Sequence, residues 1–530
     1  MATYDLTRSQ LDATLTEIKK TPEESARIIS ALTQAGLLPS GSGTLHTTVE
    51  AAPGSYTLSY SSGELFLYAG SDGTTATVTD SNGGNVLADP GSINYIGPGK
   101  DTLVGGDGAI SLTVWNGNNL LLAGLGANTL YAGSGADALW GSGTTEMHGG
   151  SGNATIQGGN SVGATDTIYG GTGHNLLSST YGNSLLLGES GQNTIWSGSG
   201  SDTMWGGGHT AMHGGSGTDT IQGGNTVGAT DTIYGGTGHN LLASTYGNTL
   251  ILADVGQNTV WSGSGSDTIW GGGHTEIHGG SGTDTIQGGN SVGATDTIYG
   301  GTGHNLLSST AGNTLILGDV GQNTIWGGSG NDTMWGGGHT EMHGGSGSDT
   351  IQAGNMAGAT DTIYGGSGQA LMASTYGNTL MYGGSGQTQM WGGSGNDTMW
   401  GGGNTLMHAG SGNAEMHGGL TAGAIDTIAG GSGNDLMTSS VGNTTFYTSA
   451  GNDTIVAGSG RDTIGAGLQG NATVWGGSAD RTTINESNTQ ASIASKVVSG
   501  GITTITFGDG QKLTSVNATI HFAGGTTIVT

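Results

Sequence analysis

A nine-residue unit that recurs along most of this chain constrains the fold more than any other feature. The unit reads Gly-Gly-x-Gly-x-Asp-x-U-x, where U is an apolar residue, and one complete copy runs from Gly327 to Trp335. Weaker copies fill the intervals between the complete ones, and five further complete copies begin at Gly214, Gly279, Gly344, Gly392 and Gly430. Such a chain is expected to fold as an array in which each unit packs on its neighbours.

The residues of one unit predict a tight turn followed by a short strand. Glycine permits positive φ angles and close stacking, so 327–330 suits a turn into which Asp332 points its carboxylate. Because side chains alternate along a strand, we expect Met334 to face inward and Thr333 and Trp335 to face outward. The sequence therefore predicts an all-β fold, a parallel β-roll or β-solenoid, with a short N-terminal helical segment.

Composition excludes two other classes of protein. Glycine supplies 114 of the 530 residues and proline only five, without the every-third spacing of collagen. Disorder is not expected, because Ile, Leu, Met, Val, Trp and Tyr recur in register with the glycines. The chain has no cysteine, so disulfides and thiolate metal sites are impossible.

The charge is strongly acidic and unevenly distributed. The formal net charge is −29, and neither Lys nor Arg occurs between Lys100 and Arg461. This distribution argues against nucleic-acid binding and against a polybasic surface for anionic lipid. It suits an exterior rich in divalent cations, and the simpler alternative is that the charge only keeps the protein in solution.

Residues 1–40 are the one region with a helical pattern. Leu11, Leu15 and Ile18 share a helical face, and the stretch from Thr21 to Glu24 forms a capping box for a second helix that ends near Gly36. The segment is expected either to cap the array or to join two copies of the chain. We expect no N-terminal secretory signal and no membrane insertion.

Two flanking regions have a strand pattern without regular glycine spacing. Residues 44–94 alternate as strands do, with a hairpin turn predicted at 82–85, and form either a small β-domain or an irregular lead-in. Residues 476–530 are expected to cap the array, with a turn at 508–510, and to carry an export signal.

Between them, residues 95–475 show a longer period of 65 residues on top of the short one. Three sets of residues show it: His148, His213, His278, His343 and His408; Asp166, Asp231, Asp296, Asp361 and Asp426; and Trp205, Trp270, Trp335 and Trp400. One block contains seven expected inward positions, namely Ile156, Ile168, Leu177, Leu185, Ile195, Met204 and Met212. An odd number of strands in a two-sided roll sends equivalent residues of consecutive blocks to opposite faces.

With six complete copies of the nonapeptide, the chain resembles the RTX (repeats-in-toxin) family over residues 95–475. The resemblance implies a calcium-binding β-roll that is exported by a type I secretion machine, which reads an uncleaved C-terminal signal, and that folds outside the cell on binding calcium. The lack of cysteine and of an N-terminal signal is similar to the family pattern.

The resemblance implies that aspartates on adjacent coils bind the calcium. Calcium takes six to eight oxygen ligands, so two turns must share one ion. With two strands per coil, the partner turn lies two units further on, and four pairs meet this condition: Asp202 with Asp219, Asp267 with Asp284, Asp332 with Asp349, and Asp435 with Asp453. Many other units carry Asn at this position, and there a hydrogen bond between coils is expected to replace the ion.

Repeated histidines and aromatic residues leave alternatives open. His209 and His213 are spaced like a metal-binding pair, but that spacing binds one ion from a helix, and on a strand an exposed structural column is expected. The outward Trp and Tyr residues suit either lateral contact, including stacking on carbohydrate, or packing over neighbouring coils.

Three classes of function are compatible with these features to different degrees. Near-identical blocks favour a secreted structural or adhesive protein that assembles with itself into an extracellular filament, surface layer or matrix. The alternative is a solenoid that binds ice or a cell-surface polysaccharide. An enzyme is not expected, because the chain has neither a zinc-binding helix motif nor a nucleophile elbow.

Overall fold

The computed structural model divides the chain into two compact units, Met1–Gly265 and Ser266–Thr530, and each unit is described by itself. No described helix is long and apolar enough to cross a membrane. The structure describes residues 2–17, 29, 45–50, 52–58, 65–68, 74–80, 85–88, 92–97, 99–106, 108–466, 470–477, 482–488 and 490–530.

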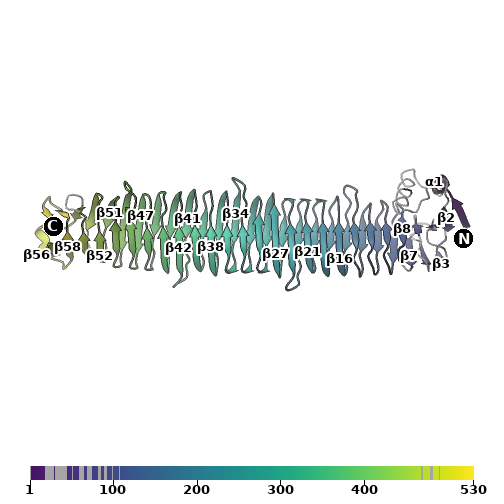
Figure 1. Cartoon of the computed structure of the whole chain (residues 1–530), viewed down its shortest axis with the longest axis horizontal. Coiled ribbons are helices and arrows are strands. Elements are labelled where there is room, and N and C mark those ends of the chain that lie inside the picture. The colour runs from purple at the N-terminus through teal and green to yellow at the C-terminus, as the bar shows by residue number, and fades with distance from the viewer. Residues whose placement is uncertain are drawn as a thin grey trace. The chain divides into compact units, whose positions relative to one another are not determined.

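Both units are parallel β-solenoids, as the sequence predicts (Figure 1). In the coils of each unit, short strands alternate between two sheets, here called A and B, and a strand pairs in parallel with the strand one coil later. Within the 65-residue blocks a coil takes 17, 18 or 21 residues. In unit 1, one block comprises β14 (Thr155–Gln157), β16 (Gly173–Ser178), β18 (Gly191–Trp196) and β21 (His209–His213) in sheet A, and β15 (Thr167–Tyr169), β17 (Leu185–Leu187) and β20 (Thr203–Trp205) in sheet B.

The count of seven strands per block is therefore confirmed for sheets A and B, apart from the two-residue strand β19 (Ser199–Gly200) in a turn, and so is its consequence within each unit. In unit 1, Trp140 lies on β12 (Ala138–Trp140) of sheet A and Trp205 on β20 of sheet B. In unit 2, Trp335 on β39 (Thr333–Trp335) belongs to sheet B, whereas Trp270 on β30 (Thr268–Gly271) and Trp400 on β46 (Thr398–Trp400) belong to sheet A. Residues 65 positions apart thus alternate between sheets.

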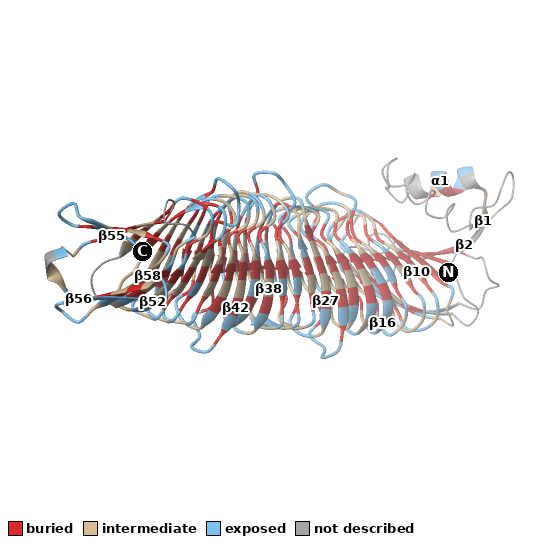
Figure 2. Ribbon diagram, turned by 60° about the vertical axis from the view of Figure 1, so that its left-hand side comes forward, coloured by how far each residue is buried: buried red, intermediate tan, exposed pale blue. Residues whose placement is uncertain are grey.

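The core consists of the inward side chains of the two sheets, seen as buried segments in Figure 2. Six of the seven inward residues expected between Ile156 and Met212 are fully buried, but the prediction for Leu185 is wrong, because Leu186 is buried in its place. Three leucines follow one another here, and Ser184 sets the register: its side chain is buried at the position that aspartate holds in the motif, so the next inward residue is two positions on.

Glycine is required where one turn stacks directly on another. Gly330 has a φ of 135°, and a Cβ added there would lie 1.6 Å from the carbonyl oxygen of Gly312 in the preceding coil. A larger residue would be strained in its backbone and would push the two coils apart.

The N-terminal segment differs in part from the prediction. The helix predicted around Leu11 and Leu15 is present as α1 (Arg8–Glu17), but the helical pattern assigned to residues 1–40 did not predict the strand before it, β1 (Ala2–Leu6). It pairs antiparallel with β2 (Leu45–Glu50), the first strand of sheet A, and so covers the edge of that strand. The second predicted helix, over 22–36, lies outside the described residues apart from Ile29.

The lead-in consists of the first coils of the same solenoid. β2 pairs in parallel with β4 (Leu65–Tyr68) and β4 with β6 (Asn85–Ala88), while β3 (Gly54–Leu58) pairs with β5 (Thr75–Asp80) and β5 with β7 (Ser92–Ile96). Residues 82–84 of the predicted hairpin turn lie outside the described residues. The strands on either side of them, β5 and β6, do not pair with each other, because they belong to different sheets and each pairs with strands one coil away.

Antiparallel strands occupy the C-terminal end of unit 2. β58 (Lys512–Val516) pairs in parallel with β54 (Gly470–Trp475) on one side and antiparallel with β57 (Ile502–Phe507) on the other. The predicted turn at 508–510 joins β57 to β58, and β57 also pairs antiparallel with β56 (Ile493–Ser499). In sheet B, β59 (Thr519–Phe522) pairs in parallel with β55 (Thr482–Glu486) and antiparallel with β60 (Thr527–Val529).

Candidate metal centre

The sixth residue of each nonapeptide, Asp in the motif, points into the core and stacks in a column with its equivalents in neighbouring coils. Its Oδ1 atom accepts a hydrogen bond from the backbone N–H at the same position of the preceding coil. All four predicted aspartate pairs are adjacent in these columns, with N to Oδ1 distances of 2.9 Å for Asp202 to Asp219, 2.9 Å for Asp267 to Asp284, 3.1 Å for Asp332 to Asp349 and 3.2 Å for Asp435 to Asp453.

Asparagine at the sixth position satisfies all its hydrogen-bonding groups locally. Asn323 Oδ1 accepts the N–H of Asn305 at 3.1 Å, and its Nδ2 donates to the carbonyl of Gly318, five residues earlier, at 2.6 Å. Asn305 does the same with Asp284 and Gly300, at 3.0 and 2.9 Å. Asparagine thus forms the hydrogen bond between coils that the sequence predicts, and its amide nitrogen adds a second bond within the coil.

Aspartate at the same position cannot donate that second hydrogen bond. Within the described part of the chain, one set of buried carboxylate oxygens has no hydrogen-bond partner, namely the Oδ2 atoms of Asp137, Asp202, Asp219, Asp284, Asp332, Asp349, Asp397 and Asp462. Their side chains are almost fully buried, and unsatisfied charged groups in such surroundings are costly.

These oxygens face other oxygens across the glycine five residues earlier. A Cβ on Gly327 would lie 2.9 Å from Asp332 Oδ2 and 2.7 Å from the Gly344 carbonyl oxygen. A Cβ on Gly344 would lie 2.8 Å from both Asp349 Oδ2 and the Gly365 carbonyl oxygen. The missing Cβ leaves a small space lined by carboxylate and carbonyl oxygens, which are the ligands that calcium prefers.

Burial also raises the proton affinity of these carboxylates. It raises the pKa of Asp219 to about 7, with a smaller contribution from the neighbouring charge of Asp202, and the pKa of Asp284, Asp332 and Asp349 to about 6. No Lys or Arg between 100 and 461 is available to balance them. At neutral pH these sites therefore favour either a proton or a cation.

The aspartates of the longest coils, Asp166 and its relatives 65 residues apart, are different. Asp361 accepts the N–H of Thr340 on Oδ1 at 2.7 Å and the N–H of Gly354 on Oδ2 at 3.0 Å. Asp231 and Asp296 have the equivalent pairs of donors. Because backbone donors satisfy both oxygens, these positions are poorer cation ligands than Asp332.

One of the four predicted pairs shares this property. Asp435 Oδ2 accepts the N–H of Gly431 at 2.8 Å, and Asp453 Oδ2 accepts the N–H of Ser449 at 3.2 Å. The cause at Asp435 is local: β49 (Ile425–Gly431) extends to Gly431, so this turn directs an N–H toward the carboxylate. The structure brings the pair together but provides protein donors for both carboxylates.

Sequence reasoning missed three of the unpartnered carboxylates, Asp137, Asp397 and Asp462. Asp397 belongs to the complete copy that begins at Gly392, but its later neighbour in the column is Ala414, so it has no aspartate partner on that side. Burial raises the pKa of Asp397 to about 7. Only the complete nonapeptide motif could have indicated Asp397 from the sequence.

The repeated histidines do not form a metal centre in the described part of the chain, where no three His, Cys, Asp or Glu side chains converge. They stack between aromatic rings of neighbouring coils instead. His213 lies 3.9 Å from the ring centre of Trp196 and 4.3 Å from that of Tyr234, and His343 lies between Trp326 and Tyr364 at 3.7 and 4.5 Å. A structural column is thus observed, but His213 and His343 are half-buried between the rings and not exposed as expected.

Comparison with known families gives one result. The family model described as RTX calcium-binding nonapeptide repeat (4 copies) matches the chain eleven times, and the matches together cover more than half of it. No curated protein is significantly similar to the chain. The matched residues are 116–145, 161–183, 178–208, 226–248, 243–275, 273–307, 308–338, 375–405, 382–416, 422–446 and 438–472.

Proposed function

Because the chain belongs to the family of RTX calcium-binding nonapeptide repeat proteins, we propose that it is a secreted structural or adhesive protein that calcium stabilises and that assembles with copies of itself. The observation that carries the calcium part is the set of buried, unpartnered carboxylate oxygens that face carbonyl oxygens. Solenoids of this family are typically non-catalytic and secreted, and type I export is part of the proposal.

The residues fit a hard cation such as calcium better than a soft metal. The oxygens around Gly344 belong to Asp332, Asp349 and the backbone, and there is no thiolate in the chain to favour a softer ion. Asp202, Asp219 and Asp284 would hold further ions. A bound ion would neutralise the buried carboxylates and link adjacent coils, and carbonyl groups would complete the ligand set.

Self-assembly is supported by the repetition and by the strand edges. The near-identical blocks present the same surfaces many times along the chain. Of the described strands at the N-terminal end, β2 is covered by β1, whereas β3 pairs with β5 on one side and with no described strand on the other. An uncovered strand edge is a site where another chain can pair.

The experiment is light scattering and electron microscopy of the full chain, with and without calcium, beside a variant that lacks residues 2–40. Ordered assemblies in calcium support the proposal, and a monomer at every concentration tested would contradict it. If residues 2–40 join two copies, their deletion abolishes assembly. If they act as a cap, deletion uncovers the β2 edge and increases association.

A further inference from the structure

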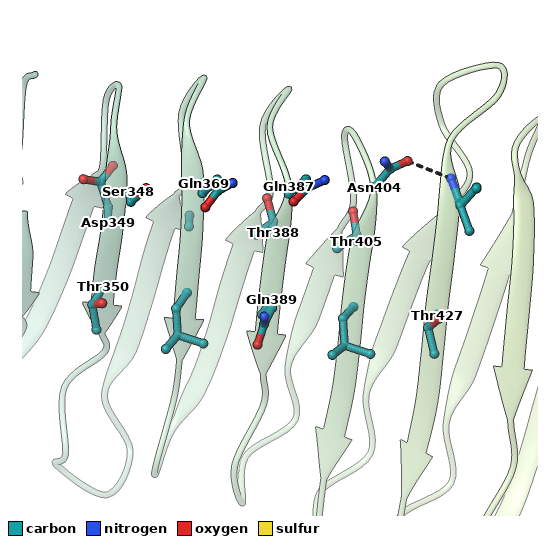
Figure 3. A pocket seen from close by; sticks show the side chains of 14 residues that line it. Ser348, Asp349, Thr350, Gln369, Gln387, Thr388, Gln389, Asn404, Thr405 and Thr427 are labelled. Atoms are coloured by element: carbon teal, nitrogen blue, oxygen red, sulfur yellow. Dashed lines mark hydrogen bonds between the residues drawn. The ribbon is translucent and has the colours of Figure 1, made fainter. Parts of the chain in front are cut away.

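A groove of about 520 Å³ crosses the outer face of sheet B in unit 2 (Figure 3). Its floor and walls come from five adjacent strands, β41 (Ser348–Gln352), β43 (Gln369–Ala373), β45 (Thr388–Trp391), β47 (Thr405–Gly410) and β49. The outward residues nearest the strand starts include Gln369, Gln387 and Asn404, and those in the middle of the strands include Leu371, Gln389 and Leu406.

The amide groups of the groove are available to a ligand. Gln369, Gln387 and Gln389 are exposed, and their side chains make no hydrogen bond to any described residue. Gln352, also on β41 but outside the groove lining, instead donates to Thr375 Oγ1 at 3.0 Å. Asn404 accepts the N–H of Ile425 on Oδ1 at 2.9 Å, an interaction drawn in Figure 3, and this bond fixes the orientation of its amide.

The groove coincides with a departure from the 65-residue repeat. Positions occupied by His304, His339, Glu341 and Thr360 in the preceding block are occupied here by Gln369, Asn404, Leu406 and Ile425, respectively. Three ionisable side chains are thus replaced by amides and a leucine. In the preceding block, Glu341 Oε1 instead lies within hydrogen-bond distance of His343 Nε2, at 2.9 Å.

The charge of the groove limits what it can bind. Its only ionisable lining residue is Asp349, which is 3% exposed and belongs to the aspartate column described above. The chain as a whole carries a net charge of −29, so an anionic ligand would be repelled and no cationic side chain is present to hold it. The groove therefore suits an uncharged ligand.

We propose that this groove binds one extended chain of a neutral polysaccharide. Neighbouring strands lie about 4.8 Å apart, so the amides form a row of evenly spaced groups across which a chain of hydroxyl-bearing rings can lie. The glutamine and asparagine amides would donate to and accept from hydroxyls, while Leu371 and Leu406 would contact the apolar faces of the rings. This function is additional to self-assembly and independent of it.

The test uses the full chain in calcium, with affinity electrophoresis and calorimetry against hydroxyethyl cellulose, glucomannan, dextran and, as the anionic comparison, alginate. The main variant, N404H/L406E, restores the residues that the preceding block carries at these positions, so the fold tolerates them. The matched control is E341L, which makes the corresponding change in the preceding block. Thermal unfolding confirms that each variant is folded.

We expect the wild type to bind at least one neutral polysaccharide, N404H/L406E to lose about tenfold or more in affinity, and E341L to bind like the wild type. If N404H/L406E does not fold, Gln389→Thr, which copies Thr324, replaces it and is expected to weaken binding in the same direction. The proposal is overturned if no neutral polysaccharide binds, if only alginate binds, or if the groove variant binds as tightly as the wild type.

Discussion

Two neighbouring parts of unit 2 have the same backbone, but only one of them leaves buried polar atoms without a hydrogen-bond partner. Around Asn305 and Asn323, every amide group of the column is hydrogen-bonded within the protein. Around Asp332 and Asp349, one oxygen atom in each side chain replaces an amide nitrogen, and two buried oxygens are left facing carbonyl groups. The asparagine coils are complete by themselves, whereas the aspartate coils need a proton or a cation.

The largest expected effect is the change in stability of the calcium-free protein with pH. The pKa of Asp219, Asp284, Asp332 and Asp349 is raised from 3.8 to about 6 or 7, so the folded state binds protons more tightly than the unfolded state. The stabilisation that these protonated carboxyl groups contribute is complete below about pH 4 and is lost as pH rises through about 6 to 7. A tenfold difference in proton affinity between the folded and unfolded states corresponds to about 1.4 kcal/mol per site.

Thermal unfolding from pH 4 to 8, in chelator and in calcium, measures this effect. Without calcium the Tm is expected to fall as pH rises, and with calcium the fall should be much smaller. A Tm that rises with pH in chelator would show that the unpartnered carboxylates are not buried as described.

Replacing a long-coil aspartate with asparagine should lower the stability of the calcium-free protein, whereas the same replacement at a motif aspartate should raise it. Asp361→Asn places an NH₂ group where a carboxylate oxygen now accepts a backbone N–H, so two donors face each other. The free energy of unfolding is expected to fall by about 1–3 kcal/mol. Urea unfolding should show this loss both with and without calcium, and rescue by calcium would contradict the assignment.

The motif pair is expected to gain stability from the same chemical change. In D332N/D349N, each new Nδ2 can donate to the glycine carbonyl five residues earlier, as Asn323 does to Gly318. Without calcium at pH 7.5 the variant should be more stable than the wild type by about 1–2 kcal/mol. Calorimetry should also show that it binds fewer calcium ions.

The reciprocal variant N305D/N323D is the control for this pair. It removes two satisfied amides and should destabilise the calcium-free protein by a similar amount. Equal effects of the two double variants, in sign and size, would mean that the identity of the sixth residue does not matter.

The smallest expected effect concerns the outer face of the same coils. His343 stacks between Trp326 and Tyr364, and H343A removes both contacts. We expect a loss of about 0.5–1.5 kcal/mol, independent of calcium. A calcium-dependent loss would indicate that the outer column is coupled to the buried one.

Much of this arrangement was predictable from residue spacing. The period of the apolar residues indicated the strand count, and the spacing of Asp332 and Asp349 placed them on adjacent coils. Residue spacing did not predict which of the neighbouring residues Leu185 and Leu186 faces inward, because that depends on packing. It also failed where a strand finds its partner far away, as with β1.

The sequence could not indicate which carboxylates are already satisfied. Asp435 and Asp332 belong to identical Gly-Gly-Ser-Gly-Asn-Asp stretches, yet only Asp435 accepts an N–H on its second oxygen, because β49 runs into its turn. That difference depends on backbone dihedral angles. The groove over β41 to β49 likewise needed the structure, since its lining residues are up to 79 positions apart in the chain.

The central claim is that calcium binds where aspartates lack a partner and not where the protein already provides one. X-ray diffraction from crystals grown in calcium, with anomalous differences, tests this directly. We predict peaks beside Oδ2 of Asp332 and Asp349, at oxygen distances of roughly 2.3–2.6 Å, and none beside Asn305, Asn323 or Asp361. Peaks at the asparagine columns, or none at Asp332 and Asp349, would contradict the account.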